Sequence, residues 1–352
     1  MSAAKAPAAM GVALALALFG LPAQPAARAG ADDALDAFGF VAERADYAPP
    51  VAEDVTVYAL TWANAPAAKV LAATTTGTLI AAADDGLYRS LDHGARWARI
   101  EALEGVQVTA ILQADQGGLY LGTLGRGVFR DDGAAGWSDD DAGLKLSNVL
   151  TVALGADGSV FAAGVVGVFR KPAQANVWMR ADEGLDGQVV NALQLGVDGA
   201  LYAGTRQGGV YRSLDGGARW APFGLEGAEV LALLALPDGA LLAGTNRRGI
   251  FLHREETGWA NIGNFDSAVH ALGAHPRDAD TLYIGTVNGL FWSPDRGKSW
   301  HPAQNGLGKD VRHLVAHPSG ALLVVASGRP WVAFDRIARA PTPSSPAYLI
   351  WL

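Results

Sequence analysis

The sequence predicts an all-β fold: a single seven-bladed β-propeller of four-stranded blades with Asp-box turns. Three observations predict it. Short apolar runs rich in Val and Thr recur along the chain, a Trp closes most of the repeats, and 44 of the 352 residues are Gly, which indicates many tight turns. One such unit cannot bury both faces of its small sheet, so copies of it must pack side by side. Closing the copies into a ring also protects the strand edges.

The repeat is visible in its Trp residues and in three further columns. The Trp residues are spaced by 40, 41, 42, 39 and 41 positions, at Trp97, Trp137, Trp178, Trp220, Trp259 and Trp300. Before each Trp comes a run such as GVYRS at 209–213, and before that run comes one such as LYAGT at 201–205. Each unit opens with an apolar run, and these runs begin near residues 69, 108, 149, 189, 230, 269 and 311. Seven openings predict seven blades.

The two ends of the chain are expected to meet in the ring. The unit that begins near residue 311 has no recognisable Asp box or closing Trp, so another segment must supply its outer strand. We expect the run VTVYALTW at 55–62 to close the ring, and the alternative is AYLIWL at 347–352. Residues 32–54 then form a lead-in, and the propeller covers residues 55–352.

Residues 1–31 have the pattern of a signal peptide. Lys5 precedes an apolar run at 10–21 that is too short to span a bilayer, and small residues follow this run. We expect cleavage near Ala29 or Ala31 and a periplasmic or secreted protein.

Composition excludes several classes of function. There is no Cys, so disulfides, thiolate catalysis and Cys-ligated metals are excluded. Without residues 1–29, which include Lys5 and Arg28, 25 basic residues face 35 acidic ones, a net charge near −10. Such a charge disfavours nucleic-acid binding. His270 and His313 lie on adjacent inner strands without a carboxylate pattern, so we predict no metal site and no cofactor. His275 and His317 share an Ala-His-Pro sequence, which indicates turns.

Three segments match the spaced pattern S-x-D-x-G-x-x-W, which is called an Asp box. In such a turn, Ser and Asp side chains accept backbone N–H groups, Gly supplies a positive φ, and Trp packs between neighbouring sheets. The boxes belong to separate blades, so their aspartates do not converge on one substrate. We therefore predict a structural role for Ser90, Asp92, Gly94 and Trp97, for Ser213, Asp215, Gly217 and Trp220, and for Ser293, Asp295, Gly297 and Trp300.

These repeats resemble the BNR/Asp-box β-propeller superfamily over about residues 57–335. The superfamily includes sialidases, two-propeller xyloglucanases, sortilin-type receptors and photosystem II assembly and stability factors. The runs LYAGT, GVYRS and SLDGGARW look most like the last group, which implies a role in assembly. Sialidases carry Arg-Ile-Pro before the first box, whereas here Arg44 and Arg89 begin no such motif and Arg336-Ile337 is followed by Ala338. Xyloglucanases of this type need two propellers, so we predict no catalytic residues and no enzyme activity.

A binding surface is predicted at the turns between second and third strands. In a propeller these turns share a face with the segments that cross between blades, and here they contain Arg126, Arg206, Arg247, Arg248 and Arg329. They predict a basic patch that docks an acidic segment of a protein partner or an anionic glycan. The alternative is that these turns simply carry solvated charge. The functional hypothesis is a monomeric, non-catalytic scaffold that assists assembly or stability of an envelope or membrane protein complex. The alternative is a carbohydrate-active protein, either a lectin-like glycan binder or a divergent glycoside hydrolase.

Overall fold

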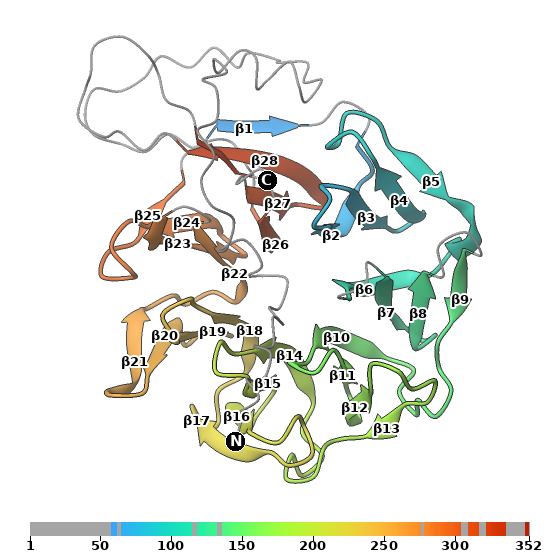
Figure 1. The fold of residues 1–352 in the computed structure, drawn as a ribbon. Helices are drawn as coiled ribbons and strands as arrows, with labels where there is room; N and C mark the ends of the chain where they lie inside the picture. Colours follow the sequence, from blue (N-terminus) through green and yellow to red (C-terminus); the bar gives the residue numbers. More distant parts are fainter. Residues whose placement is uncertain are drawn as a thin grey trace, which may run out of the picture.

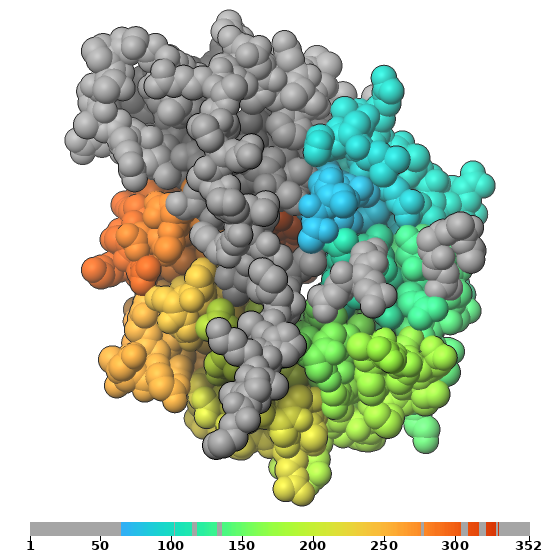
Figure 2. Space-filling view, in the orientation of Figure 1, coloured from blue at the N-terminus to red at the C-terminus, as the bar shows by residue number. Residues whose placement is uncertain are grey.

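The computed structural model describes residues 58–61, 65–114, 118–131, 136–275, 278–303, 309–316, 322–335 and 349–351. Because runs rich in Val, Leu and Thr alternate with Gly-containing turns, these residues form short antiparallel strands, and the sheets stand side by side in a ring (Figure 1). Figure 2 shows the ring as a packed surface on which consecutive blades follow one another. No helix within the described ranges is long and apolar enough to cross a membrane. The predictions made for residues 1–57 and for His317 lie outside these ranges.

The described residues form six four-stranded blades, in each of which the inner strand comes first and neighbouring strands are antiparallel. The first three contain β2 (Ala68–Ala73), β3 (Leu79–Ala83), β4 (Gly86–Ser90) and β5 (Ala98–Ile100); β6 (Gln107–Gln113), β7 (Leu119–Leu124), β8 (Val128–Asp131) and β9 (Trp137–Asp139); and β10 (Val149–Leu154), β11 (Val160–Gly164), β12 (Gly167–Lys171) and β13 (Met179–Arg180). The next three contain β14 (Val190–Leu195), β15 (Leu201–Thr205), β16 (Val210–Ser213) and β17 (Ala221–Gly224); β18 (Val230–Ala235), β19 (Leu241–Thr245), β20 (Ile250–Arg254) and β21 (Gly258–Gly263); and β22 (Val269–His275), β23 (Asp278–Thr286), β24 (Gly289–Ser293) and β25 (His301–Pro302). The short 3-10 helix η1 (Glu101–Leu103) links the first blade to the second.

A further sheet, called the closing sheet here, completes the ring with five strands. These are β26 (Val311–Ala316), β27 (Leu322–Ala326), β28 (Arg329–Asp335), β1 (Tyr58–Thr61) and β29 (Leu349–Trp351). Its inner strand β26 packs against β22 on one side and β2 on the other. The prediction of seven four-stranded blades is therefore wrong: the described residues contain six. The physical reason is that β28 pairs with β27 and also with segments from both ends of the chain, β1 and β29.

A Gly-Thr pair lies at or next to the end of four second strands, β7, β15, β19 and β23. Its two residues are needed for different reasons. Gly204 lies so close to the next blade that a Cβ atom there would be 2.7 Å from Val230 Cγ1, and the same holds at Gly244, where the distance to Val269 Cγ1 would be 2.8 Å. Only a residue without a side chain fits where two blades approach this closely. The adjacent Thr205 is fully buried, and its hydroxyl donates to the carbonyl oxygen of Gly209 at 2.9 Å, which closes the turn to the third strand.

The inner strands hold neighbouring blades together near the central axis. In the inner strand of every sheet the pairing register shifts around the second residue, which marks a β-bulge. At two of these bulges a polar side chain bonds to the next blade. Thr109 Oγ1 donates to the carbonyl oxygen of Val149 at 2.6 Å, and Asn191 Nδ2 donates to that of Val230 at 3.0 Å.

One blade has a buried ion pair at the position that Ser occupies in the Asp boxes. Lys171, at the end of β12, places Nζ 2.6 and 2.7 Å from the two carboxylate oxygens of Asp140 in the preceding blade. The side chains are 3% and 11% exposed, respectively. Tyr120 lies under the ammonium group, with its ring centroid 5.7 Å from Nζ. This blade therefore contacts its neighbour through charge where other blades have a box.

We expect Lys171→Met to lower the free energy of unfolding by about 3–5 kcal/mol, because the substitution leaves the Asp140 carboxylate buried and unpaired. Urea denaturation measures this loss. The matched control is Lys69→Met, since the ion pair of Lys69 with Asp84 is exposed and its loss should change stability by less than about 1 kcal/mol. Equal losses in the two variants would contradict the prediction.

Candidate interaction face

The ring has two faces with different turns. Successive strands of a blade run in opposite directions. The turns between second and third strands therefore lie on the same face of the ring as the segments that cross to the next blade. Hydrogen bonds confirm this arrangement: the backbone N–H of Gly227, in a crossing segment, donates to the carbonyl oxygen of Gln207, in such a turn, at 3.1 Å. We call this the crossing face. The opposite face carries the turns between third and fourth strands, and we call it the Asp-box face.

The three full Asp boxes form the same turn. In each, the Ser hydroxyl donates to the Asp carboxylate at 2.8–2.9 Å and accepts the N–H of the box Gly at 2.7–2.9 Å. The Asp carboxylate also accepts a backbone N–H four residues further along, from Arg96, Arg219 or Ser299. The box Gly residues all have positive φ, between 84° and 97°. These contacts use the carboxylates inside the turn.

Hydrogen bonding lowers the pKa of all three box aspartates. At Asp215 the N–H of Arg219 is the largest cause of the lowered pKa; burial opposes it, and the Ser213 hydroxyl adds to it. At Asp92 and Asp295 burial raises the pKa more than any single contact lowers it, but the hydrogen bonds together outweigh burial. An aspartate whose carboxylate is stabilised in this way is a poor general acid.

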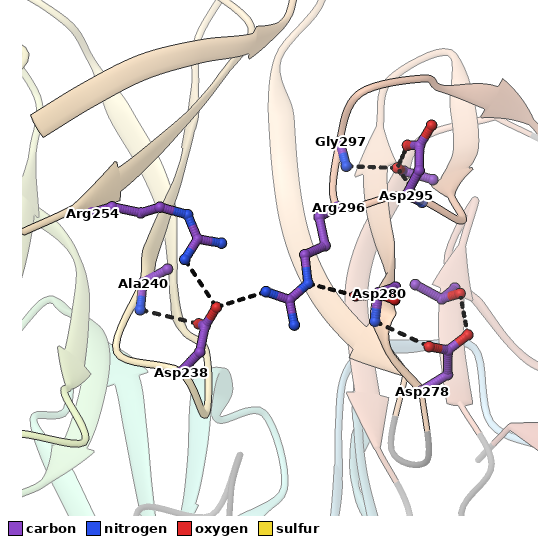
Figure 3. A network of polar contacts seen from close by, with 10 residues as sticks. Asp238, Ala240, Arg254, Asp278, Asp280, Asp295, Arg296 and Gly297 are labelled. Atoms are coloured by element: carbon purple, nitrogen blue, oxygen red, sulfur yellow. Dashed lines mark hydrogen bonds and ion pairs between the residues drawn. The ribbon is translucent and has the colours of Figure 1, made fainter. Parts of the chain in front are cut away.

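Other charges on the Asp-box face also bind neighbouring blades to each other. Arg296, the residue before the box Gly of its blade, has φ 59° and extends between two blades (Figure 3). Its Nη1 is 2.9 Å from Asp238 Oδ2 in blade β18–β21, and its Nε donates to Asp280 Oδ1 at 2.6 Å in its own blade. Arg254 contacts the same Asp238 oxygen at 3.0 Å. In this network both arginines have a carboxylate partner at hydrogen-bond distance.

Three of the predicted arginines come together on the crossing face. Arg206 lies in the turn between β15 and β16, and its Nε is 3.8 Å from Glu229 Oε1, beyond hydrogen-bond distance. The other oxygen of Glu229 accepts a hydrogen bond from Asn246 Nδ2 at 2.8 Å, in the corresponding turn of the next blade. Glu229 thus connects the turn of Arg206 to the turn that contains Arg247 and Arg248.

The crossing segment 225–229 lies between these two turns. Arg248 Nη1 is 3.4 Å from the carbonyl oxygen of Glu226 in this segment. Arg247 has φ 62°, a left-handed backbone conformation that residues other than Gly and Asn rarely adopt. We call Arg206, Arg247 and Arg248 the arginine cluster.

Arg126, a fourth predicted arginine, does not join the cluster. Arg126 lies two blades before Arg206, with its Nη2 3.6 Å from Asp139 Oδ1 and its guanidinium 4.7 Å from the centroid of Phe129. Its side chain is 52% exposed and lines an open pocket of about 440 Å³ together with Lys145, Asp139 and Asp141. The side chain of Arg329 lies outside the described part of the chain.

Two inner-strand histidines, His270 and His313, have pKa values below the ordinary range of histidine. Burial lowers the pKa of His313 to about 4, and the charge of Arg312 acts in the same direction. Burial also lowers the pKa of His270. The described residues contain no group of three or more His, Cys, Asp or Glu side chains placed to hold a metal ion.

Sequence reasoning missed Glu229 and Asn246, which join the two arginine-bearing turns. The available signal was positional. Glu229 directly precedes the inner strand β18, and Asn246 directly precedes Arg247 in the turn. A residue at the start of an inner strand lies beside the turn between the second and third strands of the preceding blade, because the crossing segment passes that turn before it enters the strand.

No protein-family model and no curated protein sequence matches the chain. Solved structures match its fold. A chain described as the extracellular domain of a one-component system from B. thetaiotaomicron has TM-score 0.65 and 15% identity, over 79% of this chain and 39% of that one. A structure of YCF48 bound to a D1 peptide has TM-score 0.64 and 15% identity, over 83% and 99%. A streptogramin B lyase has TM-score 0.64 and 13% identity, over 78% and 96%.

These likenesses decide the fold. The chain is a β-propeller. It spans about two fifths of the extracellular domain that it matches. One of the matching propellers has a peptide bound and another is named as a lyase, so the propeller fold alone does not decide between binding and catalysis.

We expect Asp215→Asn to be less stable than the unmodified protein at pH 7. A carboxyl group with a lowered pKa in the folded state stabilises that state above its ordinary pKa of 3.8, and this contribution is lost as the pH falls through the lowered value. The difference in urea midpoint between the two proteins should therefore shrink as the pH is lowered from 7 through this range. A difference that stayed constant with pH would contradict a role for the ionised carboxylate.

Proposed function

We propose that this propeller is a non-catalytic protein-interaction scaffold whose arginine cluster binds an acidic segment of a partner protein. One contrast supports the proposal. On the Asp-box face, Arg296 is held by two aspartates at hydrogen-bond distance. On the crossing face, Arg206 has its nearest carboxylate oxygen at 3.8 Å and its side chain is 51% exposed. Guanidinium groups in this condition can form the paired hydrogen bonds that a carboxylate accepts.

The backbone at Arg247 also supports a functional role. Its φ of 62° corresponds to the φ of 89° at Gly125, the equivalent residue in the turn of blade β6–β9. A left-handed conformation costs a residue with a side chain roughly 1–2 kcal/mol, whereas Gly adopts it freely. Stability alone would therefore favour Gly at position 247, and strain of this kind is common at binding sites.

Further support comes from the sequence and from one structural neighbour. The pattern of residues 1–31 is that of a signal peptide, so we propose that the mature protein is exported and that its partner belongs to an envelope or membrane protein complex. YCF48, a propeller with the same fold, was solved with a D1 peptide bound. We therefore propose a role in the assembly or stability of such a complex, similar to that implied by the repeats.

We expect each of Arg206→Glu, Arg247→Glu and Arg248→Glu to weaken binding of an Asp-rich peptide about tenfold or more. The loss of a charge-assisted hydrogen bond removes about 1.5–3 kcal/mol, and 1.4 kcal/mol corresponds to a factor of ten. Fluorescence anisotropy at several salt concentrations measures the affinity. The matched control is Arg219→Glu, which reverses the charge of an exposed arginine in an Asp-box turn, where Arg219 Nε lies 3.3 Å from Glu183 Oε1.

Arg247→Gly separates binding from stability. Because Gly adopts φ 62° without strain, this variant should be as stable as the unmodified protein or more stable, and it should still bind the peptide more weakly. Unchanged affinity in all four variants would overturn the proposal. Retention of the protein on a glycan array, with no affinity for the peptide, would favour the carbohydrate-binding alternative.

A further inference from the structure

The crossing face carries an apolar hairpin tip that neither turn chemistry nor burial explains. Gly164 and Gly167 pair across the end of β11 and β12, so Val165 and Val166 are the only two residues of the turn. Both are 44% exposed. Two-residue hairpin turns favour Asn, Asp and Gly, and β-branched side chains are poor choices there.

Equivalent turns in other sheets carry polar residues or Gly. The turns with the same two-residue length are Asp84-Asp85, Val287-Asn288 and Ser327-Gly328. Among the described turns of this kind, Val165-Val166 alone is fully apolar. The tip is also held in place, because Arg180 Nη2 lies 3.4 Å from the carbonyl oxygen of Val166.

The tip lies between two arginine-bearing turns. On one side, Asn148 Oδ1 accepts the N–H of Gly125, which precedes Arg126. The backbone of Asn148 also packs against Gly164 at the base of the tip: a Cβ atom on Gly164 would lie only 2.2 Å from the carbonyl oxygen of Asn148. Asn148 thus separates the turn of Arg126 from the Val165-Val166 tip by the width of one chain. Leu124, 42% exposed, adds a further apolar side chain on this side.

On the other side, the crossing segment 182–189 connects the tip to the turn of Arg206. A Cβ on Gly167 would lie 2.1 Å from Asp182 Oδ2, so this segment begins against the tip. It ends at Val189, whose carbonyl oxygen accepts the N–H of Arg206 at 2.9 Å. The order around the crossing face is therefore arginine, apolar tip, arginine.

We propose that the partner segment has a short apolar stretch between acidic residues, and that this stretch docks on Val165 and Val166 while Arg126 and Arg206 bind the flanking carboxylates. The inference rests on the proposed function and specifies the partner. A second copy of this chain is the poorer occupant, because a stable dimer buries about 800 Å² on each subunit, far more than two half-exposed Val side chains and one Leu provide. The two adjacent Val side chains of the tip suit a few apolar residues of an extended peptide.

Two labelled peptides test the proposal. One has two Asp residues on each side of Leu-Val-Leu, and the other has Ser-Ser-Ser in the middle. We expect the unmodified protein to bind the apolar-centred peptide about tenfold more tightly. The double variant Val165→Ser/Val166→Ser should lose this preference and keep its affinity for the Ser-centred peptide. Arg206→Glu should weaken binding of both peptides.

The control is Val197→Ser, which removes a Val of comparable exposure (52%) from a turn on the Asp-box face and should change neither affinity. Circular dichroism of each variant checks that it is folded. Equal affinity of the unmodified protein for the two peptides would overturn the inference and leave the proposed function standing, whereas no affinity for either would overturn both. A concentration-dependent dimer that the double Ser variant abolishes would identify the second copy as occupant and would also overturn the inference.

Discussion

The ring depends on one repeated contact: the indole N–H of a box-position Trp donates to a backbone carbonyl of the preceding blade. The four such bonds that the structure gives have lengths of 2.7–2.9 Å, from Trp178, Trp220, Trp259 and Trp300 to residues 36–39 positions earlier in the chain. Each bond contributes about 1 kcal/mol, and the indole ring buries a large apolar area beside it. Because the acceptor lies outside the blade of each of these four Trp residues, each bond ties the outer edge of that blade to its neighbour.

The same dependence explains the sequence columns of the repeat. Gly is required at position 204 because Val230 approaches closely. It is required at the box position 217 because a Cβ atom there would lie 2.6 Å from the ring of Phe161. Both contacts are with other blades. The repeated residues are therefore determined mainly by the contacts between blades. A single sheet is stabilised mainly by its own backbone hydrogen bonds. Turn residues on the crossing face instead contact the segments that cross between blades, as Asn246 does with Glu229.

This division separates structural charge from charge that is available for recognition. On the Asp-box face, carboxylates accept N–H groups inside turns or hold arginines between blades, as Asp238 does with Arg254 and Arg296. On the crossing face, Glu229 brings two turns together without fully pairing Arg206. The ring thus holds the turns that carry these guanidinium groups, and under the proposed function this order lowers the entropy cost of binding a partner.

The sequence alone determined the repeat, the order of the strands within it and the turns of the three full Asp boxes, because each depends on residues that are close in the chain. It also placed the arginines on one face, since strand reversal decides which turns share a face. The tertiary structure decided the number of four-stranded blades, because β28 takes partners from both ends of the chain. It likewise decided that Arg206 meets the turn of Arg247 and Arg248 while Arg126 stays apart, and that Lys171 pairs with Asp140. These outcomes depend on contacts between blades, and no local pattern encodes the distance between two side chains about 40 residues apart.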